Sequence, residues 1–502
     1  MCSYNEIGGV PACANGDILR STLEGDYGFT GFVISDADAV ALVGRVADAD
    51  SPLVAGHGFT SSLFESAVAA LVNGTSISLE DSDPDSNAYA SQLPVAVANG
   101  TLSLDVLRSV ARRVLLPRFE VGLYDDPASV PWSSIPASII EGPEHHALAR
   151  RAAAASFVLL RNNGVLPFAT PSRGGSVKKI AVVGPTSNCS ACAVGRYSGH
   201  PTVSISAWTG ISAAASAQGV SAVFGGEDMD EQAVATVAAA DAAVVMLTSE
   251  SEGESHDRFS IGFPADQVAF LSQLIATGTP LVVVVTSGGA VDVEPALAAS
   301  AVLSIGVGGM EMGSALADVL FGVTSPSARL AQTIYRASWV NASDFLSMSM
   351  RAPPGRGARY LTPNAIRDYV LFPLYSGLSY SNFSLALVDP PTSISMAALN
   401  AGAIIPLNVS VVNIGVTAAD FSVVSQLAPA APAAGWPNAW LPRSGFAKVH
   451  SLAIGAQTVA NLSLCARDFS RWNTTAHSFV IVPGSYRLSL VDSDSAVVIS
   501  VE

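Results

Sequence analysis

The sequence predicts a multidomain α/β protein that ends in an all-β domain. In residues 1–335, short apolar runs alternate with helical segments, which is typical of parallel sheets covered by helices. In residues 385–502 the apolar period changes to two and Pro, Gly and Asn turns separate the runs, with no convincing helix. That pattern indicates a β-sandwich of immunoglobulin-like size. The 502 residues suffice for about three domains of roughly 150 residues.

Composition narrows the class of protein. The chain is 49% hydrophobic and 13% charged, which suits a globular protein with a large core. Its formal net charge of -16 argues against nucleic acid or an anionic membrane as partner and fits neutral substrates. No apolar run approaches the roughly 18 residues of a membrane-spanning helix.

Residues 1–125 contain only two or three βα units. Strands are expected at 31–35 and 75–79, and helices at 16–27, 64–72 and 102–116, with Pro117 expected to kink or end the last helix. A closed barrel takes eight strands, so this region is expected to be incomplete or to pair with something absent. Met1-Cys-Ser-Tyr-Asn lacks the features of a signal peptide and reads like the end of a strand.

Residues 126–155 are predicted to be a linker. Four prolines without periodicity mark its first part, and a helix over 143–155 leads into the next domain.

Residues 156–335 are predicted to form a second α/β domain with a mostly parallel sheet. Helices are expected at 230–240 and 265–275, and strands at 157–160, 180–183, 221–224, 242–247, 281–286 and 301–305. The glycine-rich turns lack the GxGxxG pattern that binds dinucleotides. Residues 336–384 form an irregular connecting segment. In the final domain, 385–502, strands are expected at 404–412, 459–464, 478–482 and 485–490.

Cysteines and sequons bear on the compartment. Cys189 and Cys192 have CxxC spacing without a second pair or paired histidines, so a surface disulfide or free thiols are favoured over zinc. Cys2 and Cys13 are a further candidate pair. Eight Asn-x-Ser/Thr sequons are candidate glycan sites in a secreted protein: Asn73, Asn99, Asn188, Asn341, Asn382, Asn408, Asn461 and Asn473.

Asp36 is the first candidate for chemistry. It ends the buried run Gly31-Phe-Val-Ile-Ser, and helical sequence follows after Val40. A carboxylate at the carboxyl end of a barrel strand is a typical catalytic position. The structural alternative is a helix cap, which Asp also favours.

A second acidic cluster, Ser249-Glu250-Ser251-Glu252-Gly253-Glu254-Ser255-His256-Asp257-Arg258, follows the predicted strand 242–247. Crowded carboxylates raise the pKa of at least one of them, which suits a general acid, although a solvated acidic loop has the same composition. Combined with Asp36, the cluster suggests retaining glycoside hydrolysis, in which an ionised nucleophile and a protonated acid lie about 5–5.5 Å apart.

Several segments, in the right order, resemble glycoside hydrolase family 3. They are Met1-Cys-Ser-Tyr-Asn through Cys13-Ala, Gly28-Phe-Thr-Gly31-Phe-Val-Ile-Ser-Asp36-Ala-Asp38-Ala-Val, Ser156-Phe-Val-Leu-Leu-Arg-Asn-Asn-Gly-Val-Leu-Pro167, Ala181-Val-Val-Gly-Pro185, Gly195-Arg-Tyr-Ser-Gly199, Ala317-Asp-Val-Leu-Phe-Gly322 and Gly377-Leu-Ser-Tyr380. The acidic cluster and the Asp36/Asp38 pair are most similar to the β-xylosidase and α-L-arabinofuranosidase branch. The resemblance implies the C-terminal remnant of a (β/α)8 barrel over 1–125, an α/β sandwich, and a fibronectin type III-like final domain.

The resemblance also implies roles for particular residues. Asp36 would be the nucleophile, Glu254 the acid/base with Glu252 as the close alternative, and Tyr4 part of the sugar subsite. Asp257 and Arg258 would organise the acid loop. No metal or organic cofactor is implied, and the substrates would be xylo- or arabino-oligosaccharides cleaved from their ends. The family is extracellular or in the cell wall.

Departures from the family's pattern set the alternatives. The segments expected before strand six of the barrel have no counterpart here, and Ala37 stands where the family has Cys. The segment Asn73-Gly-Thr-Ser-Ile-Ser-Leu-Glu lacks the acids of the family's "AGxDxD". The alternatives are therefore a non-catalytic carbohydrate- or protein-binding chain, or a β-glucosidase of the same family.

Overall fold

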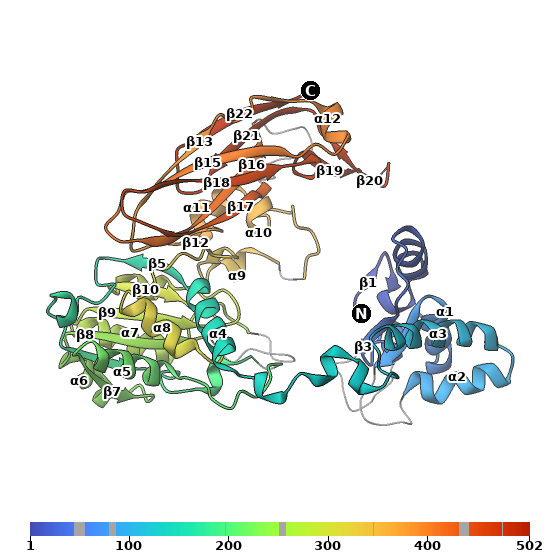
Figure 1. Ribbon diagram of the computed structural model, residues 1–502, viewed down its shortest axis with the longest axis horizontal. Coiled ribbons are helices and arrows are strands. Elements are labelled where there is room, and N and C mark those ends of the chain that lie inside the picture. The colour runs from blue at the N-terminus through green and yellow to red at the C-terminus, as the bar shows by residue number, and fades with distance from the viewer. Residues whose placement is uncertain are drawn as a thin grey trace. The chain divides into compact units, whose positions relative to one another are not determined.

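The computed structural model describes residues 1–44, 56–79, 87–195, 197–249, 258–344, 346–430, 441–473 and 475–502. The chain divides into two compact units, Met1–Ile139 and Ile140–Glu502 (Figure 1). In the described part of the chain, no helix is both long and apolar enough to cross a membrane.

The first unit is built around two parallel strands, β3 (Val33–Ala37) and β4 (Thr75–Leu79). Its other elements are the hairpin β1 (Glu6–Ile7) and β2 (Val10–Pro11), the π-helix η2 (Asp17–Asp26), α1 (Leu63–Val72), α2 (Ala88–Ala98) and α3 (Leu104–Glu120). Ser62 and Ser103 cap α1 and α3 by accepting a backbone N–H from the first turn. The predicted strands and helices of this region are thereby confirmed.

The expectation that Pro117 could end the last helix is wrong. Helix α3 continues to Glu120 although Pro117 removes one backbone hydrogen bond and crowds the carbonyl four residues earlier, because the turn after the proline still closes. The N–H of Val121 donates to the carbonyl of Pro117 at 3.0 Å.

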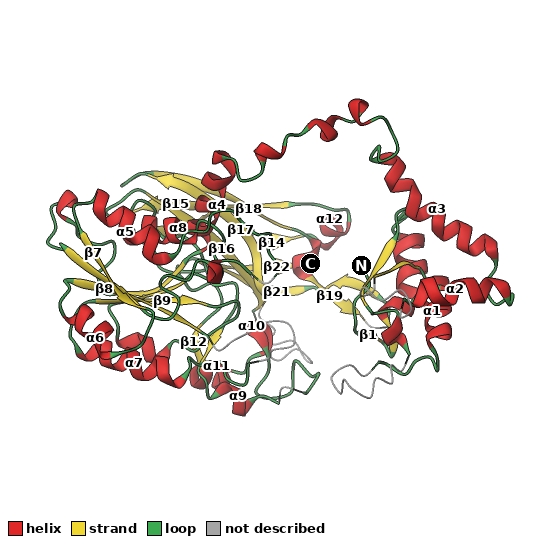
Figure 2. Cartoon of the chain, turned by 90° about the horizontal axis from the view of Figure 1, so that it is seen from below, coloured by secondary structure: helices red, strands yellow, loops and turns green. Residues whose placement is uncertain are grey.

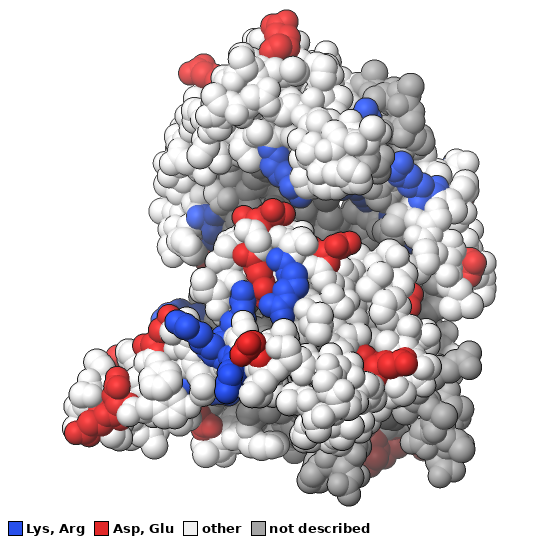
Figure 3. Space-filling view, turned by 90° about the vertical axis from the view of Figure 1, so that its right-hand side faces the viewer, with Lys and Arg blue, Asp and Glu red and all other residues white. Residues whose placement is uncertain are grey.

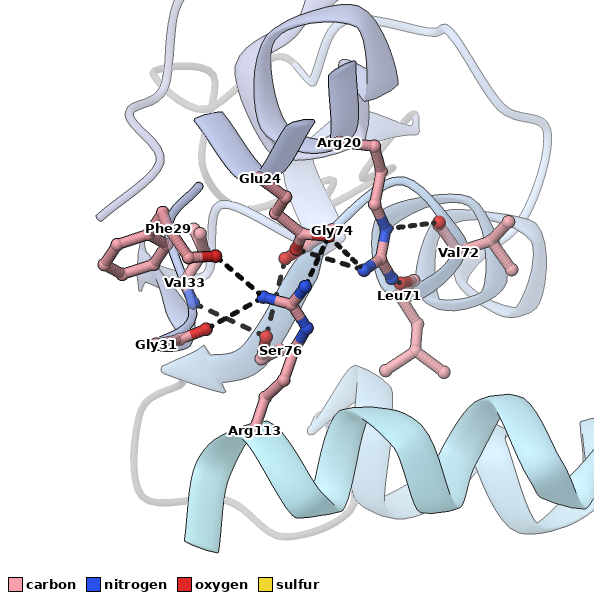
Figure 4. Close-up of polar contacts among 10 residues, drawn as sticks. All are labelled: Arg20, Glu24, Phe29, Gly31, Val33, Leu71, Val72, Gly74, Ser76 and Arg113. Carbon is pink, nitrogen blue, oxygen red and sulfur yellow. Dashed lines mark hydrogen bonds and ion pairs between the residues drawn. The ribbon is translucent and has the colours of Figure 1, made fainter. Parts of the chain in front are cut away.

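A buried charge network fixes the amino-terminal ends of β3 and β4 (Figure 4). The carboxylate of Glu24 accepts hydrogen bonds from Arg20 at 2.8 Å and from Arg113 at 2.9 Å, and its side chain is 11% exposed. Arg20 also donates to the carbonyls of Leu71 and Val72, at the end of α1. Arg113, from α3, donates to the carbonyls of Phe29 and Gly31, just before β3. The network therefore ties together four segments that are distant in sequence.

The second unit begins with α4 (Pro143–Ser156) and contains a six-stranded sheet in the order β5-β10-β9-β8-β6-β7. The strands are β5 (Val158–Asn162), β6 (Lys179–Val183), β7 (Ser221–Gly226), β8 (Ala242–Thr248), β9 (Leu281–Thr286) and β10 (Ala301–Ser304). All neighbours are parallel except β5 and β10. The predicted, mostly parallel sheet is confirmed, with all six strands near their expected positions.

Helices cover both faces of this sheet (Figure 2). Helices α5 (Ala207–Ala217) and α8 (Met312–Leu320) pack with α4 on one face. Helices α6 (Glu231–Ala238) and α7 (Ala265–Ala276) pack on the other. Each face has its own buried apolar core, which explains why the strands read as continuous Val, Ile and Ala runs.

Short elements join the sheet to the last domain. They are β11 (Ile334–Tyr335), α9 (Trp339–Ala342), α10 (Gly357–Tyr360), α11 (Pro363–Tyr369) and β12 (Val370–Phe372).

The last domain is a β-sandwich. One sheet contains β13 (Phe383–Val388), β15 (Ile405–Asn413) and β18 (Gln457–Leu464); the other contains β14 (Ser393–Ile394), β22 (Ala496–Val501), β21 (Gly484–Leu490), β16 (Ala419–Pro429) and β17 (Leu441–Leu452). A hairpin of β19 (Ser470–Asn473) and β20 (Ser478–Ile481) is separate. The sequence missed the short helix α12 (Met396–Asn400), which Ser395 caps and Leu399 anchors in the core.

Two disulfides are present among the described residues, Cys2–Cys13 and Cys189–Cys192, and Cys465 is free. The candidate pairing of Cys2 with Cys13 is confirmed. The CxxC pair, Cys189 and Cys192, forms a disulfide, which is one of the two alternatives that the sequence favoured.

Candidate active site

Asp36 lies at the carboxyl end of β3, half-buried. Its N–H donates to the carbonyl of Cys2 at 3.0 Å, and its Oδ1 accepts the N–H of Ala37 at 2.8 Å. The following short helix, Ala41–Val43, has Val40 at its N-cap and no side-chain cap. Asp36 is therefore not a helix cap, and its carboxylate is held by its own strand end.

The side chain of Ser35 holds the carboxyl end of β3 next to the end of β4. Its side chain is fully buried, donates to the carbonyl of Asp36 at 2.8 Å, and accepts the N–H of Leu79 at the end of β4. Asp38 adopts a left-handed conformation with φ 57°, and its N–H donates to the carbonyl of Leu79 at 2.8 Å. The backbone thus turns sharply away just after Asp36, which leaves the carboxylate at the edge of the sheet.

Tyr4 comes from the segment that runs beside β3. Cys2 bridges Ser35 in parallel, so Tyr4 follows two residues beyond this bridge, on the side of the sheet where β3 ends. The ring is exposed. The structure thus places Tyr4 and Asp36 on adjacent backbone segments at the same edge.

His57 is a polar residue of this edge that sequence reasoning missed. Its Nε2 donates to the carbonyl of Tyr4 at 2.5 Å, and its Nδ1 lies 3.2 Å from Glu6 Oε1. It thereby fixes the backbone that presents Tyr4. The sequence signal that could have pointed to His57 is a single histidine between two glycines, but its partner, the carbonyl of Tyr4, is remote in sequence.

Glu252, Glu254 and Asp257 lie outside the described residues, so their proposed roles stay predictions. The two ends of their loop are described. At one end, the N–H of Thr248 donates to Gln267 Oε1 at 3.0 Å, and the Ser287 hydroxyl donates to that of the buried Ser249 at 3.2 Å. At the other end, Arg258 Nη2 donates to the carbonyl of Ala290 at 3.2 Å. Both described ends of the loop are therefore held at the carboxyl edge of the second unit's sheet, Arg258 by the segment that follows β9.

A cavity of about 590 Å³ opens next to the end of this loop. Its wall includes Ile261, Ala290 and Arg356 together with two aromatic rings, Tyr335 and Trp339, which stack at 4.7 Å. Burial raises the pKa of the Tyr335 hydroxyl, and a side-chain hydrogen bond with Thr333 partly opposes this shift. Aromatic rings with a few polar groups are a common lining of small-molecule sites.

Charge does not mark a further site on the face drawn in Figure 3, where basic side chains lie beside acidic ones among a mostly uncharged surface. Among the described residues, no group of three or more His, Cys, Asp or Glu side chains is arranged to hold a metal ion.

Comparison with known proteins identifies the architecture. Residues 157–380 match the glycosyl hydrolase family 3 C-terminal domain, and residues 424–494 match a fibronectin type III-like domain. Residues 157–380 thus form a glycosyl hydrolase family 3 C-terminal domain. The two domains predicted for the C-terminal part of the chain are thereby confirmed.

Curated relatives of this chain include β-xylosidases. It is 28% identical to "Beta-xylosidase/alpha-L-arabinofuranosidase 1" of Medicago sativa subsp. varia, over 79% of this chain and 50% of the relative. It is 27% identical to "Probable exo-1,4-beta-xylosidase xlnD" of Aspergillus japonicus, over 100% of this chain and 64% of the relative. The chain thus spans about half to two thirds of the length of these relatives.

Solved structures share the fold. A family 3 exo-β-xylosidase in complex with a xylobiose aziridine activity-based probe aligns with a TM-score of 0.85 at 23% identity, over 100% of this chain and 66% of that one. A β-glucosidase from Erythrobacter marinus aligns with a TM-score of 0.81 at 27% identity, over 99% and 67%.

Proposed function

We propose that this protein is a retaining exo-β-glycosidase of the β-xylosidase type, with accompanying α-L-arabinofuranosidase activity, that acts on xylo- or arabino-oligosaccharides. The position of Asp36 carries the proposal: a half-buried carboxylate at the end of a parallel strand, held by backbone bonds and not engaged as a helix cap. Relatives named β-xylosidases over most of the chain support this substrate class.

In the proposed mechanism, Asp36 attacks the anomeric carbon and forms a covalent glycosyl–enzyme intermediate. Glu254 protonates the leaving oxygen and then activates water, with Glu252 as the alternative for this role. Tyr4 would contact the sugar beside the nucleophile. No metal or organic cofactor takes part.

The cavity lined by Tyr335 and Trp339 supports a small-molecule ligand in this part of the second unit, because aromatic side chains with a few polar groups commonly line such sites. We further propose that the protein works outside the cell or in the cell wall. Its eight sequons support a secretory route.

Covalent labelling tests the nucleophile directly. The full chain is incubated with a xylose-configured aziridine probe, and the labelled peptide is mapped by mass spectrometry. We expect the label on Asp36 and none in Asp36→Asn. Asp26→Asn, an exposed carboxylate at the end of η2, is the matched control and should label normally. A label on another carboxylate would overturn the assignment.

A binding protein without catalysis is the second candidate. The described part of the first unit has only two parallel strands, β3 and β4, whereas a complete barrel has eight. Calorimetric titration with xylotriose distinguishes the two: binding without release of xylose favours the second candidate.

A further inference from the structure

The outer face of the sheet β13-β15-β18 has an unusual composition. Eleven side chains point outward from these strands, and none is charged: Ser384, Ala386, Val388, Pro406, Asn408, Ser410, Val412, Gln457, Val459, Asn461 and Ser463. Val388 and Val459 on this face are 36% and 48% exposed. An uncharged, partly apolar sheet face in contact with water favours association between sheets unless something covers it.

Two sequons lie at the centre of this face. Asn408 of β15 is the direct cross-strand partner of Asn461 of β18, and Val388 of β13 completes the same row. Both asparagines are exposed, and neither side-chain amide makes a hydrogen bond within the described part of the chain. Inward neighbours such as Val409 and Leu462 are buried, so the strand alternation itself directs both amides outward.

At a third sequon, the asparagine side chain makes contacts within the fold and does not point freely outward. Asn73, at the C-cap of α1, donates its Nδ2 to the carbonyl of Ala69 at 2.9 Å, and its side chain packs against Gly16, where a Cβ would meet Asn73 Oδ1 at 2.5 Å. The sequon's Thr75 is fully buried and donates to the carbonyl of Cys13 at 2.7 Å. A sugar on Asn73 would break these contacts.

The chain contains a matched counterpart of that sequon. Asn99-Gly-Thr101 has the same three residue types as Asn73-Gly-Thr75, and Asn99 is likewise the C-cap of a helix, α2. Asn99 and Thr101 are both exposed. The two tripeptides therefore differ in packing and not in local sequence.

We propose that Asn408 and Asn461 are N-glycosylation sites whose glycans cover the outer face of the sheet β13-β15-β18, and that Asn73 is unmodified. The inference rests on the secretory location in the proposed function. In the reaction, the asparagine Nδ2 forms a bond to C1 of a lipid-linked oligosaccharide. The C1–O bond breaks, the lipid diphosphate leaves with the electron pair, and the amide loses one proton.

Mass spectrometry tests this independently of catalysis. The full chain is directed into the secretory pathway of a yeast host, and the secreted protein is deglycosylated by peptide-N-glycosidase in ¹⁸O-water, which marks each formerly glycosylated asparagine. We expect the mark at Asn408, Asn461 and Asn99, and its absence at Asn73. Asn408→Gln and Asn461→Gln should each remove the mass of one glycan.

Different results of this experiment would contradict different parts of the proposal. Unmodified Asn408 and Asn461, with Asn99 modified or not, overturn the proposal for the sheet face. A mark at Asn73 overturns the structural distinction between the two matched sequons. A secreted chain that carries the expected glycans but shows no xylosidase activity would contradict only the proposed function.

Discussion

The backbone N–H of Asp36 donates to the carbonyl of Cys2 at 3.0 Å, while the N–H of Cys2 donates to the carbonyl of Ile34 at 2.9 Å. The first residues of the chain thus lie beside β3 and hold the strand end that presents the candidate nucleophile. The Cys2–Cys13 disulfide closes this segment onto itself. The position of Asp36 therefore depends on a covalent link outside its own strand.

Removing that disulfide should loosen the strand end. For a loop of this size, chain entropy alone suggests a loss of about 3 kcal/mol for Cys2→Ser/Cys13→Ser. Hydrogen exchange of peptides from β3 and β4 should rise. Cys189→Ser/Cys192→Ser serves as the control, because that disulfide lies in the other unit and should leave these peptides unchanged. Equal protection in both variants would contradict the stabilising role.

Substitution of the candidate acid/base residue should slow the hydrolysis of some substrates more than that of others. Glu254→Gln is expected to lower kcat/KM for xylobiose by about 10²–10⁴-fold, because its leaving group needs protonation. Cleavage of the first bond in a dinitrophenyl xyloside should change little, and added azide should restore turnover by replacing the general base. Glu252→Gln is the matched comparison. The same signature in Glu252→Gln but not in Glu254→Gln would exchange their roles.

Glu24 should be important for the stability of the first unit. Glu24→Ala leaves the guanidinium groups of Arg20 and Arg113, 32% and 25% exposed, without their shared carboxylate. We expect a loss of about 2 kcal/mol, below the 3–5 kcal/mol of fully buried pairs because water still reaches both arginines. Urea unfolding followed by exchange of β3 and β4 peptides measures it.

The control for Glu24 is the exposed pair of Arg108 and Asp105, at 71% and 88% exposure. Arg108→Ala should change stability by less than about 0.5 kcal/mol. A comparable loss in both variants would show that the Glu24 network has no special role.

Asp241 should give the second unit a pH-dependent contribution. Its carboxylate accepts the N–H groups of Lys178 and Lys179, at 2.8 and 2.9 Å, and these bonds lower its pKa. A lowered folded-state pKa stabilises the fold above the unfolded pKa of about 3.9, and the contribution is lost as pH falls through the folded value. Asp241→Asn should therefore increase exchange in β6 at pH 7, and this effect should diminish as the pH falls from about 3.9 toward 3.

Asp228→Asn is a suitable comparison for that experiment, since Asp228 is exposed in the loop between β7 and α6, at the other edge of the sheet. Hydrogen exchange in β6 of Asp228→Asn should equal that of the parent chain at both pH values. A difference between Asp241→Asn and the parent chain that persists at low pH would contradict the electrostatic origin.

The sequence predicted much of the fold because buried strands leave a strong local signal. All six strands of the parallel sheet appear as apolar runs, since both faces of that sheet are covered. Strands β16 and β17 of the sandwich were missed, because polar residues such as Asp420, Ser422 and Ser425 interrupt the apolar run of β16. Pro442 and the polar residues that follow it interrupt β17. Helix α3 extends beyond its predicted end, because the turn after Pro117 still closes through the hydrogen bond from Val121 to Pro117.

The candidate site divides in the same way. The sequence by itself determined that Asp36 ends a strand, which residues form the acidic cluster, and that Asn408 and Asn461 are sequons, because these are properties of neighbouring residues. Only the tertiary structure decided that Asp36 does not cap a helix, that His57 holds the Tyr4 segment, and that Asn408 faces Asn461 while Asn73 is packed against Gly16. The last three relationships join positions more than fifty residues apart, and such contacts form only when the chain packs into its core.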